Sequence, residues 1–66
     1  MDKDEKLLRR PDVVAKVGLS GTTIWRLVAR GAFPAPIPIS PGRVCWLQSE
    51  IEKWIAGKVE AARRAA

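Results

Sequence analysis

The chain has 66 residues, and its 12 lysines and arginines outnumber its 7 aspartates and glutamates, for a formal net charge of +5. A chain this short is expected to form one domain, 1–66, and to bury only about 60% of its unfolded surface, which leaves no room for a deep catalytic cleft. The single cysteine and the absence of histidine exclude an internal disulfide and the common zinc sites. No apolar run is long enough to cross a bilayer, and the first twenty residues lack the apolar segment and cleavage site of a secretory signal, so we expect the protein in a reducing cytoplasm.

Two short helices joined by a glycine turn are predicted in the first half of the chain. Pro11 suits the first turn of a helix and Gly18 suits its left-handed end, which predicts a helix over residues 11–17. Ser20 is a good N-cap for a second helix over residues 21–30. Apolar side chains recur at helical spacing in both segments, so the two helices are expected to pack together as a helix-turn-helix: Val13, Val14, Val17, Ile24, Leu27 and Val28.

The opposite face of the second helix carries threonine and arginine. At about 100° per residue, Thr22, Arg26 and Arg30 fall close together and opposite Ile24, with Thr23 at their flank. Such a face on a compact scaffold is chemically suited to a DNA major groove.

A proline-rich segment follows and predicts a small β-hairpin, a wing of two strands. The Pro-Gly pair at 41–42 suits a type II turn. Alternating apolar side chains are expected to share one face of this hairpin: Ile37, Ile39, Val44 and Trp46. With a two-residue turn, Pro38 would face Cys45 at a hydrogen-bonded pair. Because proline has no backbone N–H to donate there, the ladder of hydrogen bonds must be short, offset or bulged at this point. Arg43 would project at the tip of the wing.

A third helix is predicted after the wing. Ser49 and Glu52 stand at the spacing of a capping box, and apolar residues continue at steps of three and four, although Gly57 weakens the helix by roughly 1 kcal/mol relative to alanine. Trp54 on this helix is expected to pack in the core against the first helix and the wing. We expect residues 1–6 and 61–66 to be frayed.

The three tryptophans admit two roles. Trp46 and Trp54 are favoured as core residues, because a small domain needs large buried side chains. For Trp25 a place in the core and stacking on a nucleic-acid base are both open.

The charges are distributed unevenly along the chain. From Val13 to Ser49 there is no carboxylate side chain, while this interval contains four cationic ones: Lys16, Arg26, Arg30 and Arg43. A uniformly solvated surface usually mixes both signs. The pattern therefore favours a polyanionic partner, nucleic acid before membrane, over a basic surface kept only for solubility.

Residues in four parts of the chain carry a family pattern: 8–13 (LRRPDV) at the entry; 18–27 (GLSGTTIWRL) through the second helix; 31–34 (GAFP) with Pro36 before the wing; and 43–46 (RVCW), 49–51 (SEI) and 54–55 (WI) from the wing onward. With these residues, which extend over nearly the whole chain, and with the order helix, helix, wing, helix, the sequence resembles the AlpA family of small phage and prophage transcriptional regulators. The chain departs from the family pattern at three positions: Trp25 replaces a usual tyrosine, Cys45 a usual glycine, and Gly21 a usual basic residue.

This resemblance implies a mainly α winged helix-turn-helix related to phage excisionases and to the DNA-binding part of MerR-type regulators. Double-stranded DNA is then the expected partner, and the protein is expected in the bacterial cytoplasm at the nucleoid, without cofactor or metal. Self-association on DNA, or contact with a recombinase or the transcription machinery, would also fit such a protein. The expected base contacts are Thr22, Thr23 and Arg26, and the expected backbone or groove contacts are Lys16, Ser20, Gly21, Arg30 and Arg43.

Three functions remain open on these residues. The first is a sequence-specific transcriptional regulator, the second an excisionase-like protein that bends DNA for a recombinase, and the third a module that binds another protein. An enzyme is not expected, because the sequence has no histidine, no nucleophile beside a base and no phosphate-cradling glycine loop.

Overall fold

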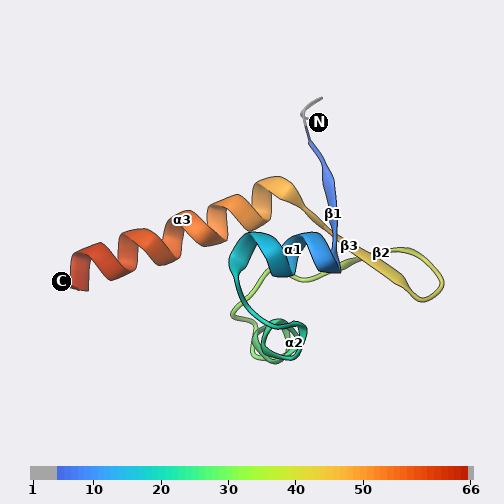
Figure 1. The fold of residues 1–66 in the computed structure, drawn as a ribbon, viewed down its shortest axis with the longest axis horizontal. Helices are drawn as coiled ribbons and strands as arrows, with labels where there is room; N and C mark the ends of the chain where they lie inside the picture. The colour runs from blue at the N-terminus through green and yellow to red at the C-terminus, as the bar shows by residue number, and fades with distance from the viewer. Residues whose placement is uncertain (1–4, 66) are drawn as a thin grey trace.

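The computed structural model describes residues 5–65 as three helices and a three-stranded antiparallel sheet, as in Figure 1. Its elements, in chain order, are β1 (Leu7–Arg9), α1 (Arg10–Val17), α2 (Gly21–Ala29), β2 (Ile37–Ser40), β3 (Arg43–Leu47) and α3 (Gln48–Ala65). This mainly helical architecture with a small sheet confirms the predicted winged-helix class.

The helix-turn-helix forms as its local signals predict. Gly18 ends α1 with φ of 74°, the left-handed conformation that a residue without Cβ adopts at little cost. Ser20 caps α2, and its Oγ accepts a hydrogen bond from the N–H of Thr23 at 3.2 Å. Pro11 lies in the first turn of α1, where its missing N–H costs no helical hydrogen bond.

The sheet contains a strand that the sequence does not predict. The predicted two-stranded hairpin forms as β2 and β3, and β1 pairs antiparallel with β3 as a third strand, which gives the order β1-β3-β2. β1 has only three residues, too few for a period-2 pattern, and its partner lies far away along the chain. Its middle residue, Leu8, is opposite Trp46, and this pairing joins the start of the chain to the central strand.

The hairpin of β2 and β3 is bulged, one of the three irregularities expected near Pro38, and Pro38 faces Val44 where a regular ladder would place it opposite Cys45. The register pairs Ile37 with Cys45, Pro38 with Val44 and Ser40 with Arg43. The extra residue, Ile39, is 50% exposed, while Cys45 is buried, so the expectation that Ile39 shares one inward face with Val44 and Trp46 is wrong. A bulge inserts one unpaired residue, and this breaks the alternation of faces on which the expectation rested.

One apolar core joins both helices of the helix-turn-helix to the sheet and to α3. Its buried members are Val13, Ile24, Phe33, Trp46 and Ile51. The indole N–H of Trp46 donates to the carbonyl of Pro34 at 2.9 Å, so the largest core side chain also has its polar atom paired. Trp54 packs at the edge of this core: its ring meets Phe33 at 4.8 Å between centroids, and its N–H donates to Ala32 at 2.8 Å. The ring and N–H contacts are with the loop after α2. We expected Trp54 to pack against the first helix and the wing, and it does border the core that contains Val13 of α1 and Trp46 of β3.

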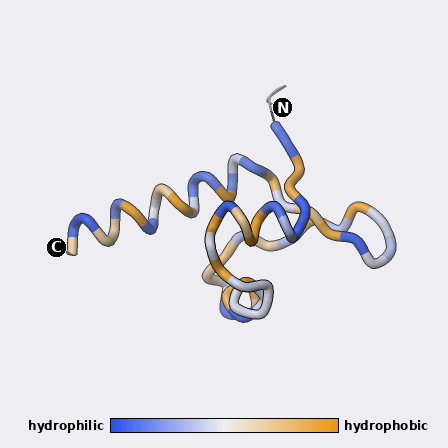
Figure 2. The backbone as a smooth tube through the Cα atoms, viewed as in Figure 1, coloured by the Kyte–Doolittle hydropathy of each residue, from blue (hydrophilic) through white to orange (hydrophobic). Residues whose placement is uncertain are grey.

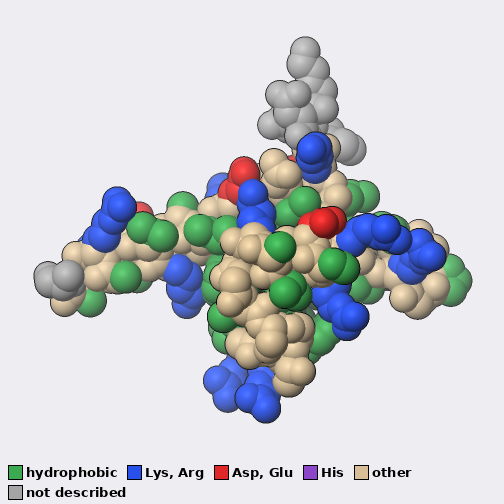
Figure 3. All heavy atoms as spheres, viewed as in Figure 1, with side chains coloured by type: hydrophobic (Ala, Val, Ile, Leu, Met, Phe, Trp, Pro, Cys, Tyr) green, Lys and Arg blue, Asp and Glu red, His purple; other side chains and the backbone are tan. Residues whose placement is uncertain are grey.

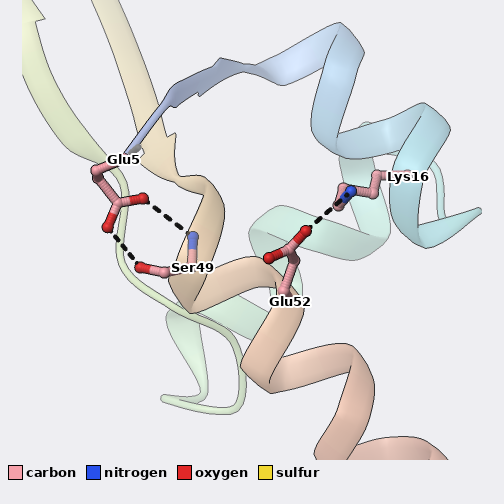
Figure 4. A network of polar contacts seen from close by, with 4 residues as sticks. All are labelled: Glu5, Lys16, Ser49 and Glu52. Carbon is pink, nitrogen blue, oxygen red and sulfur yellow. Dashed lines mark hydrogen bonds and ion pairs between the residues drawn. The ribbon is translucent and has the colours of Figure 1, made fainter. Parts of the chain in front are cut away.

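The start of α3 is capped from the far end of the chain. The helix begins at Gln48, so Ser49 lies inside it, and the predicted capping box with Glu52 is not formed. The carboxylate of Glu5 instead accepts hydrogen bonds from the Ser49 N–H at 3.2 Å and from its hydroxyl at 2.6 Å, as Figure 4 shows. Glu52 lies 3.6 Å from the ammonium of Lys16. The local spacing of Ser49 and Glu52 carries no information on whether a carboxylate from a distant part of the chain bonds to the start of the helix.

The two ends of the domain are more regular than expected. Besides the cap by Glu5, the carbonyl of Lys6 accepts a hydrogen bond from the N–H of Gln48 at 2.9 Å, and α3 continues through Gly57 to Ala65. Residues 1–4 and 66, which we also expected to fray, lie outside the described residues.

We expect Glu5→Ala to lower the free energy of unfolding by about 1 kcal/mol, the usual cost of losing a helix cap. Urea unfolding monitored by circular dichroism measures this loss. Glu60→Ala is the matched control, because it removes the same side chain from the solvent-exposed pair with Arg64, and such pairs contribute only about 0.3–0.5 kcal/mol. Equal losses in both variants would show that Glu5 does not act as a cap.

Candidate nucleic-acid interface

The outward face of α2 presents the side chains expected to contact bases. Ile24 is fully buried against the core, and Thr22 and Arg26, two positions to either side of it, are exposed. Arg30, the C-cap, is exposed one turn further along. Figure 2 shows the hydrophobic part of α2 toward the body of the domain and its hydrophilic part outward. The structure therefore brings Thr22, Arg26 and Arg30 together on one accessible surface.

Two of the expected contacts are engaged in the cap of α2. The Ser20 hydroxyl donates to Thr23 Oγ1 at 3.0 Å while it accepts from the Thr23 N–H. Thr23 is half-buried, so its hydroxyl is less accessible than that of Thr22. Gly21, which follows the cap, has an aliphatic neighbour: a Cβ at this position would lie 3.8 Å from Cδ of Arg10. The start of α2 is thus ordered by its own side chains and lies against the first turn of α1.

A hollow of about 570 Å³ lies between the start of α1, α2 and the hairpin. It is lined by Arg9, Arg10, Pro11, Trp25, Ile39, Gly42, Arg43, Val44 and Cys45. Three of these residues, Arg9, Arg10 and Arg43, carry guanidinium groups, and each comes from a different element of the fold. The Trp25 ring, 39% exposed, packs against Trp46 at 5.9 Å between centroids, so it has one side toward the core and one toward solvent. In Figure 3, lysine and arginine side chains gather at the outer end of α2 and around the hairpin.

Lys16 lies apart from this arrangement. It points toward α3, where it pairs with Glu52, and both side chains stay partly exposed, at 37% and 54% (Figure 4). A pair this exposed contributes little to stability, so it would release the ammonium readily to another anion.

Arg9 and Arg10 are not among the binding residues expected from the sequence. β1 places Arg9 opposite Cys45 on β3, and Arg9 and Arg10 line the same hollow as Arg43. The available signal was the Arg-Arg pair directly before Pro11, a cationic pair at a predicted helix start. Trp25 packs against Trp46 of the core and is also 39% exposed to solvent.

Among residues 5–65 there is no group of three or more side chains suited to hold a metal ion. The helices in that range include none that is long and apolar enough to cross a membrane. The side chains exposed on the surface described above carry guanidinium, hydroxyl and indole groups.

Comparison with known proteins assigns the family. The family model described as prophage CP4-57 regulatory protein (AlpA) matches residues 6–59. The chain belongs to the AlpA family. A protein of Enterobacteria phage P4, the uncharacterized protein ORF88, is 38% identical over 60 residues, which cover 91% of this chain and 68% of the relative. No solved structure matches the chain.

Membership in the AlpA family makes this a phage-type DNA-binding regulatory protein. The matched residues include all of α1, α2 and the hairpin, and most of α3. The family assignment therefore covers every element that forms the surface described above.

Proposed function

We propose that this AlpA-family protein is a sequence-specific transcriptional regulator that places α2 in the major groove of DNA. The observation that carries the proposal is the exposed face of α2, where Thr22 and Arg26 stand on a helix whose other side is locked into the core. Arginine can bond guanine with two hydrogen bonds, and a threonine methyl can contact thymine. A helix held by a buried stripe presents these groups with a fixed geometry, as base recognition requires.

The hairpin supports the same placement of the protein on DNA. Arg43 is exposed and directly follows the turn at Gly42, whose φ of 77° fits the predicted type II turn. In a winged helix-turn-helix the wing reaches a phosphate backbone or a neighbouring groove, and a guanidinium beside the turn is suited to either. Arg30 at the end of α2 and Lys16 are proposed as further phosphate contacts.

Selection from a random duplex library tests this function directly. The purified protein should enrich one short motif, because the α2 face carries base-reading side chains, and the motif should then locate sites in the host or phage genome. Sites in promoters would support a regulator. Sites confined to recombination arms would support an excisionase-like role instead, and failure to bind duplex DNA would refute both.

Arg43→Ala is expected to weaken binding to all duplexes alike. Loss of one phosphate contact should lower the magnitude of the slope of log affinity against log salt by about 0.9. Fluorescence anisotropy with the selected duplex and with a scrambled duplex, at several salt concentrations, measures this slope. An unchanged slope with altered sequence preference would make Arg43 a groove-reading residue.

A further inference from the structure

We propose that Arg9, Arg10 and Arg43 form one phosphate-binding surface that holds a strand of the DNA duplex beside the start of α2. The inference rests on the proposed function and deepens it, because it adds two residues of β1 and α1 to a site otherwise made of α2 and the hairpin. The ligand is the phosphodiester backbone of double-stranded DNA.

The first argument is that the three guanidinium groups line one concave surface. Arg9 ends β1, Arg10 begins α1 and Arg43 begins β3, yet all three border the same hollow. Arg9 is the pairing partner of Cys45 on β3, two positions from Arg43, which fixes their proximity through the sheet. Three like charges so close together repel one another, and a bound polyanion removes this cost.

The second argument is that the hollow holds no carboxylate to neutralise them. None of its lining residues, all from the described part of the chain, is acidic. Asp12, the nearest carboxylate in sequence, accepts a hydrogen bond from the backbone N–H of Arg9 at 3.2 Å and does not line the hollow. The arginine side chains are exposed, so they can reach a ligand without desolvating a buried charge.

The third argument connects the hollow to α2. The side chain of Arg10 passes next to Gly21, with its Cδ 3.8 Å from where a Cβ would stand. Trp25 of α2 also lines the hollow with its partly exposed ring, next to Ile39. A strand that leaves the groove occupied by α2 would therefore meet guanidinium groups for its phosphates and apolar side chains for its deoxyribose carbons.

Salt dependence on a mixed-sequence 20-base-pair duplex gives the first test. Arg9→Gln and Arg10→Gln should each bind on the order of 8-fold more weakly at 0.1 M salt and lower the slope magnitude by about 0.9, as one lost phosphate contact predicts. Arg63→Gln, which removes the same charge from the exposed end of α3, should leave the slope closer to that of the wild type. Thermal melts of each variant confirm that these exposed substitutions leave the fold intact.

Pairing each arginine with a phosphate gives the second test. Single phosphates of the selected duplex are replaced by neutral methylphosphonates. Neutralising a phosphate that one of these arginines contacts should weaken DNA binding by the wild-type protein. The same replacement should cause no further loss of affinity in the Arg9 or Arg10 variant that lacks the contacting arginine, and the phosphates that behave in this way should be adjacent. Additive losses at every phosphate would overturn the proposal.

The outcomes separate this inference from the function on which it rests. If the wild-type protein binds duplex DNA and the Arg9 and Arg10 variants keep its slope, the phosphate surface is wrong while the proposed function stands. If these variants lose affinity for a 20-nucleotide single strand and not for the duplex, the hollow takes an unpaired base on Trp25, and the duplex assignment is overturned. If the wild-type protein binds no duplex at all, both proposals fail.

Discussion

Trp46→Ala is expected to unfold most of the protein near physiological temperature. Trp46 is fully buried, and truncating a buried tryptophan costs about 3–5 kcal/mol through lost transfer energy and the cavity that remains. The variant also leaves the carbonyl of Pro34 without its donor. At roughly 0.05–0.15 kcal/mol per residue, a domain of this size has about 3–10 kcal/mol of total stability, so one substitution removes much of it.

Urea unfolding followed by far-ultraviolet circular dichroism measures the loss, and two variants give its controls. Trp46→Phe keeps most of the ring and should cost less than Trp46→Ala. Trp25→Ala removes an equally large side chain that is 39% exposed and should also cost less. If Trp25→Ala proves as damaging as Trp46→Ala, the core would be centred nearer α2 than the burial of these residues indicates.

Arg26→Ala is expected to reduce binding to the selected site by roughly 5- to 150-fold while changing binding to scrambled DNA much less. This range corresponds to the roughly 1–3 kcal/mol of discrimination that a bidentate arginine–guanine contact provides. Because Arg26 is exposed, its truncation should leave the fold intact. Both affinities are measured at the same salt concentration, because binding through phosphate contacts changes with salt and such a change would be mistaken for base recognition.

Arg30→Ala is the matched control on the same helix, because Arg30 is exposed at the C-cap of α2 and is proposed to contact phosphate. It should weaken binding to both duplexes to a similar extent. Equal losses on the two duplexes for Arg26→Ala would assign it to the backbone and leave base recognition without its main residue.

Local signals were enough to predict the helix-turn-helix. Gly18, Ser20 and the apolar spacing act within a few residues, so their effects can be read from one stretch of chain. The outward face of α2 follows from the same spacing, because burying Ile24 exposes Thr22 and Arg26. An irregular ladder was also predictable, since Pro38 lacks the N–H that a regular ladder needs, although a short, an offset and a bulged ladder all satisfied this requirement.

The exposed position of Ile39 follows from a local bulge, whereas the other features that the sequence did not predict concern contacts between distant parts of the chain. β1, the cap by Glu5 and the position of Arg9 and Arg10 beside Arg43 all depend on how the start of the chain meets the segment around β3. Ser49 and Glu52 have the correct spacing for a capping box, but both find partners elsewhere. Composition and spacing do not specify which distant groups come into contact, so two of the three arginines at the hollow, Arg9 and Arg10, could be assigned to it only from the structure.

The same long-range pairing has a kinetic consequence. The β2–β3 hairpin closes across a short turn, and hairpins of this kind form in about 1–10 μs. The contact between Glu5 and Ser49 joins residues 44 positions apart, and the entropy of closing so long a loop must be overcome before β1 can add its hydrogen bonds. β1 is thus expected to dock last during folding and to detach first during local opening, which makes its amide protons the fastest to exchange in the sheet.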